Sequence, residues 1–259
     1  MMDYMGRNKE KTKKMNKTKI EWADYTWNPI TGCSRKCEYC YARKIARRFG
    51  KTKNEKEFIP TFHPERLNDI RKIKNPSKIF VCSMGEIFDP QVRLDWLIKI
   101  FKIIEDYSFH TFILLTKNAD MLNNLCLSLP SNVWLGTTIE DSYGNPCNFI
   151  SFLNKLALIN SWGRAKDIQS WKNKSKFQGK IFISFEPLLG DVFSNFASYF
   201  YSLSWKWDWF IVGGQTNPNK QPKHEWVENI VAHAKQHVIP LFIKNNTGWK
   251  DIIQEFPTD

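Results

Sequence analysis

Short apolar runs of strand length recur along most of this chain, and helical stretches separate them. The runs are continuous and rich in Ile, Val, Phe and Leu, which is typical of parallel strands buried on both faces of a sheet. A first strand is expected within Ile20–Ile30, which brings the number of strands to about seven. The other runs are Ile79–Cys82, Thr111–Leu115, Val133–Gly136, Ile181–Phe185, Trp209–Val212 and Pro240–Ile243.

Amphipathic helices are expected in the intervals between these runs. Tyr41, Ile45 and Phe49 lie at positions i, i+4 and i+8, which predicts a helix that begins after Cys40 and ends near Gly50. The alternation of strands and helices predicts an α/β fold, a parallel (βα) barrel that is partial or near-complete and TIM-like. The other expected helices are Pro64–Ile73, Leu94–Tyr107, Ala119–Leu127, Asn148–Ile159 and Trp226–Gln236.

Two segments depart from the alternation. Residues 1–17 are lysine-rich and have no apolar periodicity, so we expect a disordered basic tail, with residues 18–259 forming a single barrel domain. Residues 160–180 are polar and rich in turn formers. Because the strand–helix alternation resumes after them, they are interpreted as an insertion and not as a domain boundary.

Three of the six cysteines, Cys33, Cys37 and Cys40, are clustered in the spacing C-x3-C-x2-C. Thiolates this close in sequence can converge on one metal centre. A structural zinc site needs four ligands, commonly two pairs, and no second C-x2-C pair exists in the chain. Iron–sulfur clusters are normally held by four thiolates. Three ligands leave one iron with an open position, where chemistry can occur.

The charge distribution bears on possible partners. The net charge is +12, and residues 1–57 contain 16 Lys or Arg against 7 Asp or Glu. This asymmetry favours a polyanionic partner, with nucleic acid as the first candidate, while a solvated lysine-rich tail is the alternative. No apolar run approaches the ~20 residues of a membrane span, and no secretory leader is recognisable. We therefore expect a cytoplasmic protein without membrane association.

The cysteine spacing, with Tyr39 just before the last cysteine, resembles the cluster loop of radical S-adenosylmethionine (SAM) enzymes. The resemblance implies that Cys33, Cys37 and Cys40 hold a 4Fe-4S cluster whose fourth iron binds SAM. It also implies cleavage of SAM to methionine and a 5′-deoxyadenosyl radical, which abstracts a hydrogen atom from the substrate. An electron donor such as flavodoxin or ferredoxin would then be a partner.

The wider chain resembles a phage-associated subgroup of that superfamily whose function is unassigned. The resemblance covers nearly everything after the N-terminal tail. It rests on the segments Lys19–Trp22, Thr26–Pro29, His63–Leu67, Glu186–Gly190, Ile211–Gly214 and Phe242–Lys244.

Polar residues follow each predicted strand. In barrels of parallel strands, active-site residues come from the loops after the carboxyl ends of the strands, and the loops at 138–150 and 215–225 are candidate lids. The polar segments are Ser83–Glu86, Thr116–Asn118, Thr137–Glu140, Glu186–Pro187, Gly213–Gln215 and Lys244–Asn246.

The resemblance suggests roles for some of these residues. Ser83, Gly85 and Glu86 stand where radical SAM proteins carry a Gly-Gly-Glu-like motif that receives the amino group of SAM, although only Gly85–Glu86 matches it. Thr138 and Glu140 are expected on the ribose and adenine side of SAM. Tyr39 is expected beside the adenine. Candidates for the substrate end, without a motif to rank them, are Lys117, Glu186, Gln215 and Lys244.

The remaining cysteines and histidines carry weaker signals. Cys126, among leucines, is expected to be a buried hydrophobic residue. Cys82 and Cys147 are candidates to donate a hydrogen atom to a product radical. His63 could complete a zinc site, and His233 with His237, at i and i+4, is interpreted as a surface pair.

Two other functional classes remain open at this stage. A non-enzymatic, metal- or cluster-stabilised nucleic-acid-binding protein would explain the cysteines and the charge. A barrel with a degenerate site could act as a phage-associated interaction protein. The binding protein does not account for polar residues at six strand ends, and the intact cysteine spacing with Gly85–Glu86 argues against the degenerate site.

Overall fold

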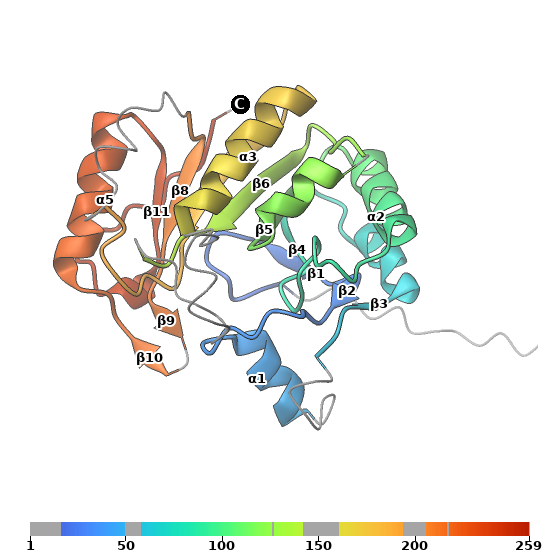
Figure 1. Cartoon of the computed structure of the whole chain (residues 1–259), viewed down its shortest axis with the longest axis horizontal. Coiled ribbons are helices and arrows are strands. Elements are labelled where there is room, and N and C mark those ends of the chain that lie inside the picture. The colour runs from blue at the N-terminus through green and yellow to red at the C-terminus, as the bar shows by residue number, and fades with distance from the viewer. Residues whose placement is uncertain are drawn as a thin grey trace, which may run out of the picture.

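The computed structural model describes residues 17–49, 58–125, 127–141, 161–193, 206–216 and 218–258 of the chain. One seven-stranded sheet forms its centre (Figure 1). All neighbouring strands in it are parallel and follow one another in chain order. The first and last of the described strands are not paired, so the sheet is an open half-barrel, and the predicted partial (βα) barrel is confirmed. The strands are β1 (Tyr25–Trp27), β4 (Lys78–Val81), β5 (Thr111–Thr116), β6 (Val133–Thr138), β7 (Lys180–Phe185), β8 (Trp209–Val212) and β11 (Leu241–Ile243).

Helices cover the outer face of the sheet. Figure 1 shows α2 (Leu94–Asp106), α3 (Ser161–Ser175) and α5 (His224–Gln236) along one side of the strands, whereas α1 (Tyr41–Arg48) lies apart from them. The outward residues of the strands form one large core with the apolar stripes of these helices. The strands therefore carry apolar residues at successive positions, because both faces of the sheet are buried.

The inner face of the sheet carries a second core that is mainly aromatic. Trp209 is its centre, with ring centroids 5.6 Å from Trp134, 5.5 Å from Phe182 and 5.3 Å from Phe256 of the C-terminal segment. Gly136 makes room for this layer, since a Cβ there would lie 2.4 Å from the Phe182 ring. The aromatic layer fills the half-barrel near the amino ends of the strands, and the carboxyl ends remain for polar residues.

The expected single strand within Ile20–Ile30 is two strands. Pro29 separates β1 from β2 (Ile30–Thr31), and the Pro29 carbonyl accepts a hydrogen bond of 2.8 Å from the His63 amide. β2 pairs in antiparallel fashion with β3 (Thr61–Phe62), and β9 (Gln215–Thr216) pairs with β10 (Asn219–Lys220). A proline cannot donate to a sheet ladder, which explains the break.

Two predicted helices are 3-10 helices, Pro64–Lys72 and Ala119–Asn124, and a third short one spans Asn245–Thr247. Neither of the two predicted segments has a side-chain hydrogen bond at its N-cap. The predicted helices at 94–107 and 226–236 agree with α2 and α5 to within two residues.

The interpretation of residues 160–180 as an insertion is wrong. Residues 161–175 form α3, which packs on the sheet through Trp162, Ala165, Ile168 and Trp171. These four residues repeat every three positions, and the residues between them are polar or glycine. In a helix of 3.6 residues per turn, this spacing spreads the four apolar side chains over about half of the helix circumference. The segment therefore lacks the clear apolar face of an amphipathic helix, which is why it resembles a loop in sequence.

Several predictions concern residues outside the described ranges. They are the tail at 1–17 apart from its last residue, the helix at 148–159, Cys126, Cys147 and most of the lid at 138–150. Within the described residues, no helix combines the length and the apolar character that a membrane crossing requires.

Candidate functional site

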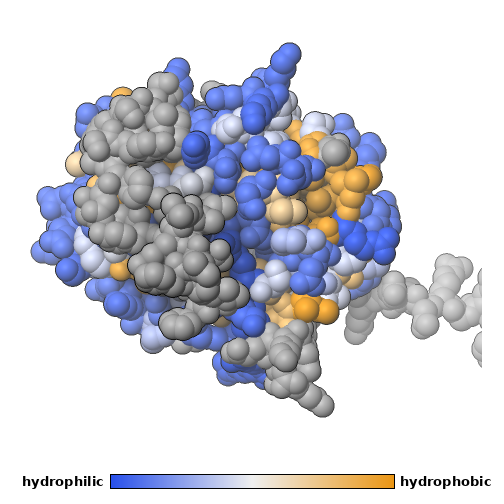
Figure 2. Space-filling model, in the orientation of Figure 1, coloured by the Kyte–Doolittle hydropathy of each residue, from blue (hydrophilic) through white to orange (hydrophobic). Residues whose placement is uncertain are grey.

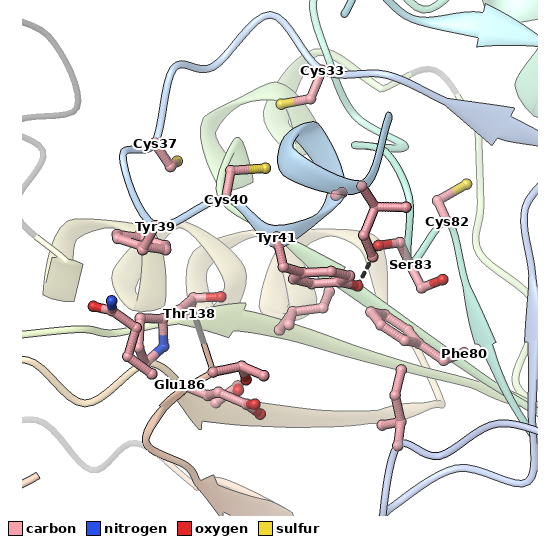
Figure 3. A pocket seen from close by; sticks show the side chains of 18 of the residues that line it. Cys33, Cys37, Tyr39, Cys40, Tyr41, Phe80, Cys82, Ser83, Thr138 and Glu186 are labelled. Atoms are coloured by element: carbon pink, nitrogen blue, oxygen red, sulfur yellow. Dashed lines mark hydrogen bonds between the residues drawn. The ribbon is translucent and has the colours of Figure 1, made fainter. Parts of the chain in front are cut away.

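A cavity of about 680 Å³ lies at the carboxyl ends of the strands. The cysteine loop (residues 32–40) forms one side of it, and Figure 3 shows Thr138 and Glu186 across from this loop. Eleven of the twelve predicted site residues line the cavity: Cys33, Cys37, Tyr39, Cys40, Ser83, Gly85, Glu86, Lys117, Thr138, Glu186 and Lys244.

The cysteine loop begins at a glycine that no other residue could replace without strain. Gly32 has a φ of +92°, and a Cβ on it would lie 1.9 Å from the carbonyl oxygen of Ile59. The Gly32 amide donates to the Met84 carbonyl at 2.9 Å, and the Glu86 amide donates to the Gly32 carbonyl at 3.1 Å. These bonds fix the start of the loop against the segment that follows β4.

The middle of the loop is tied to the segments that follow β4 and β5. The amide and the hydroxyl of Ser34 both donate to Oδ2 of Asp89 at 2.7 Å. The Arg35 guanidinium donates to the Lys117 carbonyl and, at 3.0 Å, to Oδ1 of Asn118. The loop is therefore shaped by contacts distant in sequence.

Arg43 holds the loop from the side of α1. Its guanidinium is buried, lies 5.0 Å from the centroid of the Phe58 ring, and donates to the carbonyls of Cys33 and Arg35. A buried cation that gives its donors to loop carbonyls restricts the backbone that carries the cysteines.

The three thiols differ in their surroundings. Cys40 is the N-cap of α1, and its Sγ accepts from the Arg43 amide at 3.4 Å. Burial, and next the charge of Glu86, raises the pKa of the Cys33 thiol to about 12. Binding of iron at Cys33 would therefore release a proton.

The donor set fits an iron–sulfur cluster better than a single metal ion. Among the described residues, no group of three or more His, Cys, Asp or Glu is arranged to hold one ion. In a 4Fe-4S cluster, each thiolate binds a different iron, so the sulfurs need not converge on one point. His63 does not line the cavity, and its Nε2 lies 2.8 Å from Oγ1 of Thr31. The structure gives His63 no place as a fourth ligand beside the cysteines.

The cavity wall also contains two buried hydroxyls without a hydrogen-bond partner in the described protein, Thr138 Oγ1 and Ser184 Oγ. Buried polar groups are normally paired. These two groups therefore fit a cavity that binds a polar ligand next to the cysteine loop.

Glu86 is buried and already accepts three hydrogen bonds. Its Oε1 accepts from the Thr116 hydroxyl at 2.7 Å and the Phe88 amide at 3.1 Å, and its Oε2 accepts from the Lys117 amide at 3.0 Å. Burial raises the pKa of Glu86 against the opposing effect of these donors. A carboxylate offers about four acceptor positions, so one remains for a ligand.

Glu140, the twelfth predicted residue, does not line the cavity but supports two residues that do. Its carboxylate accepts from the Tyr39 hydroxyl and pairs with Lys117 Nζ at 3.4 Å and with Arg164. Burial acts to raise the pKa of Glu140, but the charges of Lys117 and Arg164 outweigh it and lower this pKa to about 2. Lys117 Nζ is also 5.7 Å from the centroid of the Tyr39 ring.

Glu186 and Lys244 form an ion pair on the opposite wall. Their side chains are only 21% and 12% exposed. Gly213 gives them room, because a Cβ there would lie 2.8 Å from Cδ of Glu186 and 3.0 Å from Cδ of Lys244. The pair brings a carboxylate and an ammonium to the cavity from β7 and β11.

Sequence reasoning missed Ser184 and Arg164. Phe182 and Ser184 of β7 and Glu186, directly after β7, occupy alternate positions. Ser184 therefore lies between the aromatic layer, which contains Phe182, and the ion pair, which contains Glu186. A lone serine within an apolar strand was the available signal for Ser184. No signal was available for Arg164, because its segment was interpreted as an insertion.

The remaining cysteine and histidine predictions have mixed outcomes. Cys82 is buried and lines the cavity, and burial raises its pKa to about 12. His233 and His237 lie on or next to α5, with ring centroids 4.4 Å apart, and they do not line the cavity. The expected surface pair is wrong for His233, which is buried against Phe193 and Phe210.

A family model described as a protein of unknown function (DUF5131) matches residues 17–157 and 163–256. No curated protein sequence matches the chain.

Solved structures of spore photoproduct lyase share the fold. A cysteine-to-serine mutant has a TM-score of 0.54 and 12% identity, covering 89% of this chain and 78% of that one. A tyrosine-to-phenylalanine mutant has a TM-score of 0.53 and 11% identity, with coverage of 89% and 78%. The lyase complexed with dinucleoside spore photoproduct has a TM-score of 0.51 and 12% identity, with coverage of 88% and 65%. At such low identity, the similarity establishes a common fold.

Proposed function

The chain belongs to the DUF5131 family, and we propose that it is a radical SAM enzyme whose substrate is a base or nucleotide of a nucleic acid. The observation that carries this proposal is the cysteine loop. It presents C-x3-C-x2-C to a cavity at the mouth of the half-barrel and is held there by hydrogen bonds from three other segments. The fold shared with spore photoproduct lyase, a radical SAM enzyme, supports the proposal.

Cys33, Cys37 and Cys40 would hold a 4Fe-4S cluster, and SAM would bind beside it. When bound, the cluster would supply the electron for reductive cleavage of SAM, the chemistry by which a hydrogen atom would be abstracted from the substrate. A flavodoxin or ferredoxin would supply the electron to the protein. The chain's own residues bind, orient and shield these groups.

The segment Ser83–Glu86 would receive the amino group of SAM. Glu86 has one acceptor position left for an ammonium, and a charge-assisted bond there would favour its ionised form. Gly85 allows the segment to approach the loop closely, since a Cβ on it would lie 2.9 Å from the Gly32 carbonyl oxygen. Thr138 and Ser184 would give their unpaired hydroxyls to polar groups of SAM or substrate.

The other predicted residues would orient the adenine and the substrate. Glu140, with Lys117, holds the hydroxyl of Tyr39 and so positions its ring for the adenine side. Glu186 and Lys244 would bind polar groups of the substrate on the far wall. The aromatic layer below, including Trp22 and Phe80, limits access of water from the closed end of the half-barrel.

Nucleic acid is the proposed substrate class for two reasons. The N-terminal 57 residues carry an excess of nine positive charges, and a solved structure with this fold contains a dinucleoside photoproduct. A base in a duplex would have to leave the stack to reach a cavity of this kind.

The test is anaerobic reconstitution with iron and sulfide, followed by electron paramagnetic resonance of the reduced protein with and without SAM. We expect a reduced 4Fe-4S signal that changes when SAM is added, together with formation of 5′-deoxyadenosine. Alanine variants of Cys33, Cys37 and Cys40 should each lose both results, whereas Cys126→Ala, which lies outside the motif, should keep them.

A single bound zinc, or a cluster whose signal does not respond to SAM, would contradict the proposed enzymatic function. A metal- or cluster-stabilised nucleic-acid-binding protein would then be the better description.

A further inference from the structure

One stripe of α1 faces the cavity. Tyr41, Lys44, Ile45 and Arg48 line it and lie at positions i, i+3, i+4 and i+7, which share one side of a helix. The helix sequence YARKIARR contains no acidic residue. In Figure 2, hydrophilic residues gather at the lower edge of this face, where Figure 1 places α1.

Residues 18–20 also bring positive charge to the cavity. Thr18, Lys19 and Ile20 line it, and within the described parts of the chain neither Lys19 nor Arg48 makes an ion pair. One acidic residue, Glu21, is close, and its Oε2 already accepts from the Asn245 amide at 3.0 Å.

The charge deeper in the cavity is balanced. Lys117 pairs with Glu140, Lys244 pairs with Glu186, and the charge of Arg35 acts on Glu86. The unpaired positive charge among the described cavity residues is therefore that of Lys19 and Arg48, on residues 18–20 and on α1, which we call the outer end of the cavity.

We infer that this outer end is a channel for the phosphodiester backbone of a single-stranded or extruded stretch of nucleic acid. Lys44 and Arg48 contact phosphates, and Tyr41 and Ile45 contact sugars or bases. This inference rests on the proposed function, because the channel leads a base toward the cysteine loop.

The stripe has the composition that such a ligand requires. Binding of single strands combines cations that follow the backbone with aromatic or apolar surfaces for the bases. Lys44 and Arg48 are about 6 Å apart along the helix axis, a spacing that neighbouring phosphates of an extended strand can match. An acidic peptide would satisfy the cations but would leave Tyr41 and Ile45 without a matching partner.

The experiment measures binding of a fluorescent single-stranded oligonucleotide to the full-length reconstituted protein at several salt concentrations. Arg48→Gln and Lys44→Gln should each weaken binding by about three- to fivefold. Each should also reduce the slope of log affinity against log salt by about 0.7. Arg47→Gln is the matched control, because it removes the same charge from the same helix at an exposed position that does not line the cavity.

Equal losses for Arg47→Gln and Arg48→Gln would overturn the inference, since the helix would then act only through its total charge. Displacement of the oligonucleotide by an acidic peptide of equal charge, at equal concentration, would overturn it as well. Formation of 5′-deoxyadenosine by the same samples keeps the two proposals separate. If no 5′-deoxyadenosine forms but Arg48→Gln alone weakens oligonucleotide binding, the channel is supported and the enzymatic function is not. If 5′-deoxyadenosine forms but Arg47→Gln and Arg48→Gln weaken binding equally, the enzymatic function is supported and the channel is not.

Discussion

Thr138 and Ser184 are register partners on the neighbouring strands β6 and β7, and neither hydroxyl has a hydrogen-bond partner in the described protein. Both side chains are fully buried and line the cavity. A buried hydroxyl left unpaired costs about 1–3 kcal/mol of folding free energy. Because the fold gives neither hydroxyl a partner, we expect both to form hydrogen bonds with a ligand in the cavity.

Thr138→Val and Ser184→Ala should each weaken binding of SAM or substrate by roughly 2- to 12-fold, the equivalent of about 0.5–1.5 kcal/mol. Neither substitution should lower the melting temperature, because no internal hydrogen bond is lost. Equilibrium binding and thermal unfolding of the reconstituted protein would measure the two effects.

Thr137→Val is the control for this pair. The Thr137 hydroxyl donates to the Thr116 carbonyl at 2.8 Å, so its loss should cost about 1 kcal/mol of stability without changing ligand affinity. The same loss of stability in Thr138→Val would show that its hydroxyl serves the fold.

Removing one member of the Glu186–Lys244 pair should lower the free energy of unfolding more than removing both. Lys244→Met leaves the Glu186 carboxylate without its partner in a mostly buried position, and we expect a loss of about 1–3 kcal/mol in the free energy of unfolding. The double variant with Glu186→Gln should recover part of this loss. Urea denaturation of both single variants and the double variant gives the coupling, and strictly additive effects would argue against a real pair.

Glu140 should make the protein sensitive to acid. Its pKa falls from an ordinary value of 4.5 to about 2 in the folded protein. A lowered folded-state pKa contributes stability that is complete above 4.5 and is lost as the pH falls toward 2. The contribution should be on the order of 3 kcal/mol.

Glu140→Gln would lack this contribution. The difference in unfolding free energy between the native protein and this variant should therefore shrink between pH 4.5 and pH 2. A difference that stays constant across this range would mean that Lys117, Arg164 and Tyr39 do not hold the carboxylate as described.

Cys82 is the described candidate for a hydrogen-atom donor. In such a step its S–H bond breaks, a C–H bond forms on the substrate radical, and the thiyl radical is reduced by one electron from the donor protein and one proton. Cys82→Ala should keep 5′-deoxyadenosine formation but change the product made from the substrate. An unchanged product in the double variant with Cys147→Ala would remove both cysteines from this role.

The sheet was predictable because its strands are short, apolar at successive positions and regularly spaced. The same regularity placed the site, since residues such as Glu86 and Glu186 follow strand ends that meet at one mouth. α3 was not predictable, because its contacts through Trp162, Ala165, Ile168 and Trp171 exist only once the sheet is present.

The individual roles of the site residues could not be predicted from the sequence. Glu140 and Tyr39 are 101 positions apart, and only the folded chain shows that one holds the other. Ser184 lies inside an apolar strand, and its importance comes from the register with Thr138. The cluster chemistry, the phage-associated subgroup and the electron donor remain predictions.

The cysteine loop is made before the residues that anchor it, so it cannot take its final shape when it is first synthesised. The loop is synthesised early, but its supports are the Met84 carbonyl, the Lys117 carbonyl and the Glu140 carboxylate. A ribosome must therefore add about a hundred further residues before Cys33, Cys37 and Cys40 can take their final positions. The proposed cluster would meet a loop without its supports on any shorter chain, so its loading should follow folding of the segment through Glu140.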